Sequence, residues 1–215
     1  MDRKDIPLTG KSNRKNLKKI KLNNKTIILA SHNAGKIAEF RTLFSNYNVK
    51  IQTISMLGVN DINETGKTFE ENAIIKVKNV PDGSIGLSDD SGLCIKSLNN
   101  EPGIFSARFA QKNGGWSKAM KKLYFEAKKK NCLDARFHCT LALKEENSEI
   151  SIFTGEIDGK LTWPPKGKNG FGYDPFFIPS NSKMTFGQMS HLKKIFLDHR
   201  FEAFKKMSKF HLIDN

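Results

Sequence analysis

The stretch TIILASHNAGK, residues 26–36, sets the expected fold class. Its first five residues form a short apolar run that predicts a buried strand. Residues 31–36 then form a turn that contains one glycine, and Ile37, Phe40 and Phe44 follow it at helical spacing. A strand, a glycine-containing turn and a helix in this order are typical of the opening of an α/β domain.

Helical and extended patterns alternate through the rest of the chain, so we expect one α/β domain with a mixed sheet and no second domain or repeat. The expected elements are a helix over residues 70–80, short strands over 85–88 and 93–95 around a polar turn at 89–92, a helix over 117–131, a hairpin that pairs 136–143 with 149–154, and a helical segment over 190–210 interrupted near Asp198.

Composition excludes several classes of protein. The chain has 215 residues, of which 38% are hydrophobic and 27% charged, and a chain of this length can bury a core without disulfide or metal staples. No apolar run approaches the roughly 20 residues of a membrane helix, so we expect no membrane partner. The three cysteines form no CxxC pair, which disfavours a zinc ribbon and fits a reducing compartment such as the cytoplasm.

Half of the excess positive charge lies at the N-terminus. The formal net charge is +14, and residues 1–25 hold nine basic residues against two acidic ones, a net of +7. This segment lacks apolar periodicity, so we interpret residues 1–25 as a solvated, disordered arm and residues 26–215 as the folded domain. An arm that binds nucleic acid is the alternative interpretation. The remaining +7 suits a polyanionic ligand without requiring a nucleic acid.

The turn Ser31-His32-Asn33-Ala34-Gly35-Lys36 has the features of a phosphate site. A turn that opens a helix offers backbone N–H groups to an anion, and Lys36 adds a point charge. It is not a Walker A loop, because the first glycine is missing and Ile37 stands where Ser or Thr would bind Mg²⁺. An ordinary helix start explains the same pattern equally well.

The segment Asp89-Asp90-Ser91-Gly92 indicates a metal site. Two adjacent carboxylates at a strand end suit Mg²⁺ binding and activation of water beside a phosphate. In a strand the two side chains point to opposite faces, so only one of them would reach a given ligand. The same residue types also build ordinary polar turns. A second carboxylate would have to come from elsewhere, and the candidates are Glu64, Glu70 and Glu71.

The segment Gly170-Phe171-Gly172-Tyr173-Asp174-Pro175 suits a flat ring. Small residues let such a ring lie against the backbone while Phe171 or Tyr173 stacks on it, and Asp174 could accept hydrogen bonds from a base or ribose. Packing of an aromatic loop on the core is the alternative, and we prefer it for Phe176 and Phe177.

Three cationic side chains follow near the C-terminus. An N-cap at Asp198 would place His199 and Arg200 in the first turn of a new helix, where both could point toward Lys194. A solvated helix face is the alternative for such charges.

These pieces occur in an order that resembles the inosine/xanthosine triphosphate pyrophosphatase family from about Lys25 to the C-terminus. Besides residues 26–36, the matching blocks are Thr68-Phe69-Glu70-Glu71-Asn72-Ala73, Asp89-Asp90-Ser91-Gly92-Leu93, Pro102-Gly103-Ile104-Phe105-Ser106-Ala107-Arg108, Ala135-Arg136-Phe137, Gly170-Phe171-Gly172-Tyr173-Asp174-Pro175 and His199-Arg200. The chain departs from the family pattern at Lys166, at Gly187-Gln188 and at Asp198, and the basic arm lies outside that pattern.

The resemblance implies a two-lobed α/β fold around a long mixed sheet, with the nucleotide in a cleft between the lobes. It also implies a cytoplasmic, homodimeric, Mg²⁺-dependent enzyme that hydrolyses ITP, dITP and XTP to the monophosphate and pyrophosphate, cleansing the nucleotide pool. Asp90 would be catalytic, and Glu64 and Asp90 would bind the metal. The implied substrate-binding residues are Ser31, His32, Asn33, Ala34, Gly35, Lys36, Ser91, Phe171, Gly172, Tyr173, Asp174, Lys194, His199 and Arg200.

Within the base site, His199 and Arg200 are predicted to donate hydrogen bonds to the purine O6, which would disfavour the amino group of adenine. Two other functions stay open. One is a related pyrophosphatase that prefers modified pyrimidine nucleotides. The other is a nucleic-acid-binding module, which the scarcity of aromatic residues among the lysines of 11–25 and 118–130 disfavours, so we expect no specific nucleic acid partner.

Overall fold

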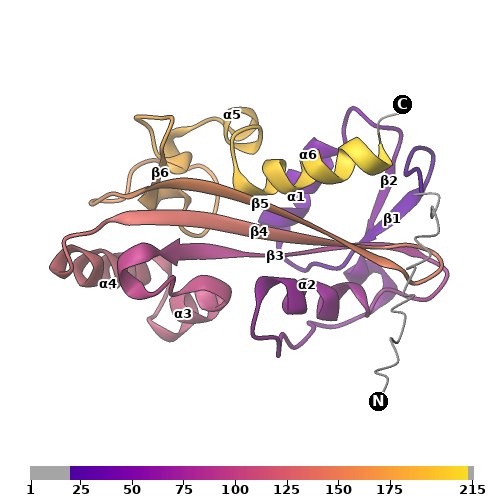
Figure 1. Cartoon of the computed structure of the whole chain (residues 1–215), viewed down its shortest axis with the longest axis horizontal. Helices are drawn as coiled ribbons and strands as arrows, with labels where there is room; N and C mark the ends of the chain where they lie inside the picture. The colour runs from indigo at the N-terminus through magenta and orange to yellow at the C-terminus, as the bar shows by residue number, and fades with distance from the viewer. Residues whose placement is uncertain (1–19, 213–215) are drawn as a thin grey trace, which may run out of the picture.

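The computed structural model describes residues 20–212, and these form an α/β fold around one mixed sheet (Figure 1). The strands are β1 (Thr26–Leu29), β2 (Lys50–Thr53), β3 (Ile85–Ile95), β4 (Asp134–Lys144), β5 (Ile150–Leu161) and β6 (Phe177–Pro179). The helices are α1 (Ala34–Leu43), α2 (Phe69–Val77), α3 (Ser106–Lys112), α4 (Trp116–Lys129), α5 (His191–Ile195) and α6 (His199–His211).

The sheet has the strand order β2-β1-β3-β4-β5-β6. β1 pairs in parallel with both β2 and β3, while β4, β5 and β6 are added antiparallel. The strand, turn and helix predicted from residues 26–36 are β1 and α1, and the predicted hairpin is β4 and β5. The expectation of an α/β fold with a mixed sheet is therefore confirmed.

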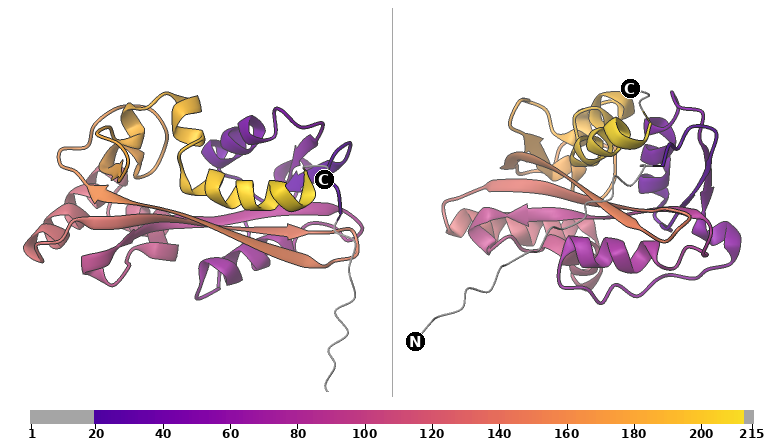
Figure 2. Two further views of the ribbon diagram at one scale, coloured as in Figure 1. Left: turned by 45° about the horizontal axis from the view of Figure 1, so that its top comes forward. Right: turned by 45° about the vertical axis from the view of Figure 1, so that its right-hand side comes forward.

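Helices cover both faces of this sheet (Figures 1 and 2). α1, α5 and α6 lie on one face, and α2, α3 and α4 lie on the other. The alternation in β4 explains the first layer, because Cys139, Leu141 and Leu143 are all buried in one hydrophobic cluster with residues of α6. Ala142, which points the other way, packs in a separate cluster with residues of α2.

The hydrophobic core divides the molecule into two halves. One half contains the clusters around β1, α1, α2 and α6, and the other contains the cluster formed by α4, the ends of β3 and β4, and residues 173–189. Phe176 and Phe177 are fully buried in this second half, as predicted. β3, β4 and β5 run through both halves, which agrees with the two-lobed fold that the resemblance implied.

Residues 89–92 are not a turn. β3 is one continuous strand of 11 residues, and Asp89, Asp90 and Gly92 pair with Leu141, Thr140 and His138 of β4. The prediction of two short strands around a turn was wrong. Backbone hydrogen bonds to β4 hold the polar residues 89–92 in an extended conformation that their residue types alone do not favour. Gly92 is needed here for space, because a Cβ at this position would lie 2.1 Å from the carbonyl oxygen of Gly103.

The helix boundaries follow the sequence closely. α2 ends at Val77 rather than at the predicted Val80, and α4 covers residues 116–129 where the sequence predicted 117–131. The predicted interruption near Asp198 is confirmed, because α5 ends at Ile195 and Asp198 caps α6 by accepting the amide of Phe201 at 2.8 Å.

The folded part of the chain begins before Thr26. Leu22 is fully buried in the same cluster as α6, and its amide donates to the carbonyl oxygen of His211 at 2.8 Å. The boundary predicted after residue 25 was therefore too late. Residues 1–19 of the predicted arm lie outside the described residues.

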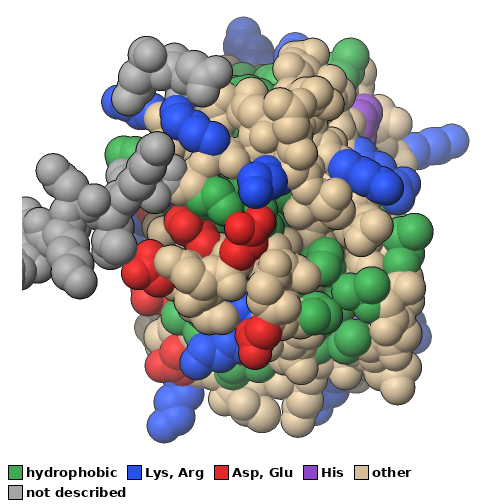
Figure 3. Space-filling model, turned by 90° about the vertical axis from the view of Figure 1, so that its right-hand side faces the viewer, with side chains coloured by type: hydrophobic (Ala, Val, Ile, Leu, Met, Phe, Trp, Pro, Cys, Tyr) green, Lys and Arg blue, Asp and Glu red, His purple; other side chains and the backbone are tan. Residues whose placement is uncertain are grey.

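At the end of the molecule that carries the β4–β5 hairpin, Asp and Glu side chains gather in one group, with Lys and Arg side chains around them (Figure 3). Glu145, Glu146 and Glu149 lie in or beside the hairpin turn, and burial together with the neighbouring carboxylates raises the pKa of Glu145. None of the helices in residues 20–212 is long and apolar enough to cross a membrane.

Candidate active site

A cleft of about 590 Å³ lies between the two halves of the molecule. Its first wall comes from Ala30, which follows β1, and from the turn before α1, the segment 61–64 and α2. Its second wall comes from residues 104–108, Trp116 and the loop 171–174. β3 forms the floor through Asp90 and its neighbours. Lys194, His199 and Arg200 belong to α5 and α6, which lie on the face of the sheet opposite to α2, and they also line the cleft. Residues far apart in the sequence therefore meet in one cavity.

A buried lysine holds the two predicted metal ligands together. Lys76 Nζ of α2 lies 3.0 Å from Asp90 Oδ1 and 2.7 Å from Glu64 Oε1. The other carboxylate oxygen of Asp90 accepts a hydrogen bond from Asn72 at 3.2 Å. Arg108 approaches Glu64 at 3.6 Å from the opposite wall. Asp90 and Glu64 thus lie side by side, as the resemblance implied.

Burial and charge act in opposite directions at this point. Burial raises the pKa of Asp90 above its ordinary value, although Lys76 and Lys36 oppose the shift. Burial lowers the pKa of Lys76, but the carboxylates of Asp90, Asp89 and Glu64 more than compensate, so its pKa is raised. Lys76 is therefore a cation that neutralises two carboxylates in a largely buried place.

The donor set at this point suits a hard divalent cation. Asp90 and Glu64 supply carboxylate oxygens close enough to contact one cation together, as Lys76 demonstrates. Mg²⁺ is commonly bound by one or two carboxylates, with the remaining positions taken by water and substrate phosphates. Within residues 20–212 there is no group of three or more His, Cys, Asp or Glu side chains that could hold a metal. Asp90 and Glu64 are two side chains, so a metal site made of this pair is compatible with that finding.

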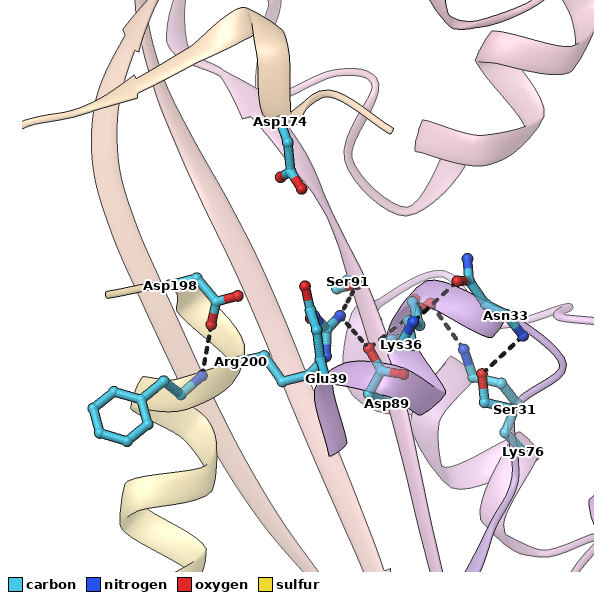
Figure 4. A network of polar contacts seen from close by, with 12 residues as sticks. Ser31, Asn33, Lys36, Glu39, Lys76, Asp89, Ser91, Asp174, Asp198 and Arg200 are labelled. Carbon is cyan, nitrogen blue, oxygen red and sulfur yellow. Dashed lines mark hydrogen bonds and ion pairs between the residues drawn. The ribbon is translucent and has the colours of Figure 1, made fainter. Parts of the chain in front are cut away.

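The turn before α1 is built as a capped helix start (Figure 4). Asn33 is the N-cap, and its side chain accepts the amide of Lys36 at 3.1 Å, while Ser31 Oγ accepts the amide of Asn33 at 3.3 Å. A capped start leaves other first-turn amides available to an anion. Lys36 lies beside this turn, with its amine 3.0 Å from Asp89 Oδ2.

Asp89 and Asp90 point to opposite faces of β3, as predicted for a strand. Asp89 is fully buried and lies 2.9 Å from Nη2 of Arg200, in addition to its contact with Lys36 (Figure 4). Burial alone would raise the pKa of Asp89, but Lys36 and Arg200 hold it well below its usual range. Of the two neighbours, Asp89 is a structural anion and Asp90 faces the cleft.

Arg200 is one of the most deeply buried side chains of the described chain, with 1% of its surface exposed. Its Nη1 donates to Glu39 of α1, and its Nη2 donates to Asp89 and, at 3.1 Å, to Ser91 Oγ. Ser91 and Arg200 therefore meet, and both terminal nitrogens of Arg200 are already engaged with carboxylates or with Ser91. Donation from Arg200 to a purine O6 stays a prediction.

Lys194 and Asp174 complete the buried charge network. Lys194 Nζ contacts Glu39, lies 2.7 Å from Asp198 and 3.7 Å from Asp174. Burial would lower the pKa of Lys194, but these three carboxylates raise it. Burial raises the pKa of Asp174 to about 6, against the opposing effect of Lys194, and one oxygen of Asp174 accepts the amide of Phe171 at 2.9 Å.

His199 is neutral in this environment. Burial, followed by the charges of Arg200 and Lys194, lowers its pKa well below the ordinary value. Its ring stacks on Phe137 at 4.7 Å, and its buried Nδ1 has no hydrogen-bond partner among the described residues. A buried ring nitrogen without a partner at the edge of a cleft is available to a ligand.

The aromatic loop 171–174 approaches the phosphate turn closely. A Cβ added to Gly35 would lie 2.5 Å from the ring of Phe171, so the glycine of the turn is what allows this ring to cover the start of α1. The amine of Lys194 lies 5.4 Å from the centre of the same ring. Tyr173 is buried, and its hydroxyl donates to the carbonyl oxygen of Ser106 at 3.3 Å.

The sequence model of the Ham1 family matches residues 27–210. The chain belongs to the Ham1 family. Its curated relatives in this family include a dITP/XTP pyrophosphatase of Zymomonas mobilis, which is 39% identical over 186 residues, covering 84% of this chain and 89% of that protein. A dITP/XTP pyrophosphatase of Bacillus licheniformis is 37% identical, covering 86% of this chain and 96% of that protein.

Solved structures of Ham1 proteins share the fold. A HAM1 protein from Coxiella burnetii aligns with a TM-score of 0.78 at 37% identity, covering 86% of this chain and 97% of that one. The Staphylococcus aureus Ham1 protein aligns with a TM-score of 0.75 at 35% identity, again over 86% of this chain. The cleft therefore lies in a fold that experiment has determined for relatives.

His32 of this Ham1-family chain makes two contacts within the protein. Its Nε2 lies 2.8 Å from the carbonyl oxygen of Val59, and its Nδ1 lies 3.1 Å from Asp61. His32 therefore ties the phosphate turn to the segment that carries Glu64. His32 also lines the cleft, and its contact with substrate stays a prediction.

Sequence reasoning assigned no role to several residues in or beside the Ham1-family cleft. Lys76, Arg108 and Trp116 line the cleft, while Asn72 and Glu39 lie behind it and contact its residues Asp90 and Lys194. For Asn72 and Lys76 a signal was present, because they are spaced four residues apart beside the apolar Ala73 and Val77. Polar residues within the buried stripe of a helix indicate an internal polar partner.

Proposed function

We propose that this Ham1-family chain hydrolyses the non-standard purine nucleotides ITP, dITP and XTP to the monophosphate and pyrophosphate. The observation that carries the proposal is the pairing of Asp90 with Glu64 through Lys76 in one cleft, beside a capped helix start. Curated relatives at 37–39% identity carry the name dITP/XTP pyrophosphatase, which supports the same reaction.

Binding of the triphosphate uses the first wall of the cleft. The start of α1 and the amine of Lys36 attract the phosphates, and Lys76 and Arg108 lie near enough to add positive charge. Catalysis of phosphoryl transfer depends mainly on positioning and on neutralising charge. The carboxylate of Asp90 orients the water that attacks the α-phosphorus, which explains why it faces the cleft while Asp89 does not.

Magnesium dependence is part of the proposal. Asp90 and Glu64 are the residues that would hold Mg²⁺, and the ion would supply positive charge at the phosphate oxygens when bound. Lys76 occupies the space between these carboxylates in the described structure and keeps them in place.

Base selection belongs to the second wall. The loop 171–174 provides the aromatic surface, and His199 offers a buried nitrogen without a partner. A site that donates to the purine O6 rejects adenine, whose amino group is itself a donor, because buried donors would be left unpaired. We further propose that the enzyme acts in the cytoplasm and forms a homodimer.

The test is to measure pyrophosphate release from a panel of nucleoside triphosphates, with and without Mg²⁺. We expect rapid Mg²⁺-dependent hydrolysis of ITP, dITP and XTP and slow hydrolysis of ATP. A preference for modified pyrimidine nucleotides would replace the proposed substrate class. Hydrolysis of none of the nucleotides would overturn the enzymatic function altogether.

A further inference from the structure

Trp116 is a large aromatic side chain that the core leaves uncovered. It is 38% exposed and lines the cleft on the second wall. The other tryptophan of the chain, Trp163, packs against the core and stacks on Tyr124 with ring centres 5.8 Å apart. Packing therefore explains Trp163, whereas Trp116 is placed where a ligand can reach it.

The chain directs Trp116 into the cleft through a defined turn. Gly114 and Gly115, with φ of +77° and +105°, precede Trp116, which is the first residue of α4. Backbone of this kind is favourable for glycine and strained for other residues. The buried stripe of α4 begins one turn later at Ala119 and Met120, so Trp116 extends that stripe beyond the core and into the cavity.

The indole contacts the aromatic loop that we assign to the base. It meets Tyr173 edge to face, with ring centres 5.0 Å apart and planes at 88°. A Cβ on Gly172 would lie 3.5 Å from the six-membered ring of the indole, so this ring packs directly over the loop backbone. Trp116 thereby joins Phe171, Gly172 and Tyr173 into one continuous surface built from two separate elements.

We propose that Trp116 contacts the purine base of the bound nucleotide, an inference that rests on the proposed function and adds a base-binding residue to it. The indole carries no charge that would attract a triphosphate, while its flat apolar face matches a purine ring. Stacking of a base on an aromatic side chain is lost on substitution by alanine, with an effect of roughly 5- to 150-fold on binding.

The two tryptophans provide a matched pair of reporters. In Trp163→Phe the tryptophan emission comes from Trp116 alone, and in Trp116→Phe it comes from Trp163 alone. We expect the product IMP to quench the emission of Trp163→Phe and to leave that of Trp116→Phe unchanged. Ribose 5-phosphate, which has no base, should leave both unchanged. IMP binding without any change in the emission of Trp163→Phe would overturn the inference.

Activity provides the second readout. We expect Trp116→Ala to raise KM for ITP roughly 5- to 150-fold with a smaller effect on kcat, and Trp116→Phe to restore most of the loss. Thermal melting of each variant separates loss of binding from loss of folding. A Trp116→Ala variant that keeps the wild-type KM would contradict the inference and leave the proposed function intact. Absence of nucleotide hydrolysis by the wild-type chain would instead remove the proposed function and this inference with it.

Discussion

Asp89 and Asp90 are adjacent in the sequence, yet their environments give them different chemistry. Asp89 is held between two cations, Lys36 and Arg200, which keep its pKa low, whereas burial keeps the pKa of Asp90 above its ordinary value. The alternation of a strand is sufficient to separate them, because it points one carboxylate to each face of the sheet. Chemistry at this site therefore depends on the face a residue occupies more than on its type.

The first prediction concerns Asp90. Replacement Asp90→Asn should lower kcat by about two to four orders of magnitude, because a carboxylate that positions water and metal is lost without a change in shape. Circular dichroism and thermal melting should show a folded protein. The matched control is Asp134→Asn, a half-exposed carboxylate at the start of β4 outside the cleft, which should keep normal activity. Normal turnover by Asp90→Asn would disprove the assignment.

The second prediction concerns Arg200. Replacement Arg200→Ala leaves Asp89 and Glu39 as buried carboxylates without this partner, so the free energy of unfolding should fall by about 3–5 kcal/mol. With both terminal nitrogens already engaged, we expect ITP and ATP hydrolysis to fall by the same factor. The check is chemical denaturation together with kcat/KM for both nucleotides. If the ITP-to-ATP ratio narrows, Arg200 reads the base as the sequence predicted.

The third prediction is a pH dependence from Asp174. Its pKa of about 6 in the folded protein exceeds the ordinary value of 3.8, chiefly because of burial, so between these values the native state binds a proton that the unfolded chain has released. Stability therefore falls as pH rises through this window, by up to about 3 kcal/mol, and stays lower above it. The difference in unfolding free energy between wild type and Asp174→Asn, measured by urea denaturation at several pH values, should show this fall, because the other titrating groups are present in both proteins.

At the scale of elements, local sequence patterns predicted most helix and strand boundaries. They failed where an element is stabilised by hydrogen bonds to a segment far away in the sequence. The strand β1, the helix α1 and the break before α6 each depend on residues within a few positions, such as the cap at Asp198. The polar centre of β3 is a strand only because β4, some fifty residues later, pairs with it. For the same reason the sequence did not predict the role of Lys76, because its partners Asp90 and Glu64 belong to other segments.

The fourth prediction concerns the segment that precedes β1. Replacement Leu22→Ala should lower the free energy of unfolding by about 2–5 kcal/mol, because Leu22 is fully buried beside α6. The matched control is Leu192→Ala, where 60% of the residue is exposed and the expected change is small. Equal stability of the two variants in urea denaturation would show that residues 20–25 are not part of the folded domain.

At the scale of the whole molecule, β3, β4 and β5 connect both halves of the core, so the halves should not unfold separately. The fifth prediction is one calorimetric transition whose van't Hoff enthalpy equals the calorimetric enthalpy. Saturation with IMP should raise the temperature of that single transition, since the ligand binds the native state alone. Two resolved transitions would show that the halves are independent.

The continuous strands also set how the cleft can move. In many two-lobed enzymes a few loop residues act as a hinge and absorb the whole change in backbone angles. Here the link between the walls is a hydrogen-bonded ribbon of three strands, β3, β4 and β5, each eleven or twelve residues long. Widening the cleft bends that ribbon, and an elastic sheet resists more strongly the further it is bent. We therefore expect the cleft to open only by a limited amount and to return to the same width when the bending force is removed.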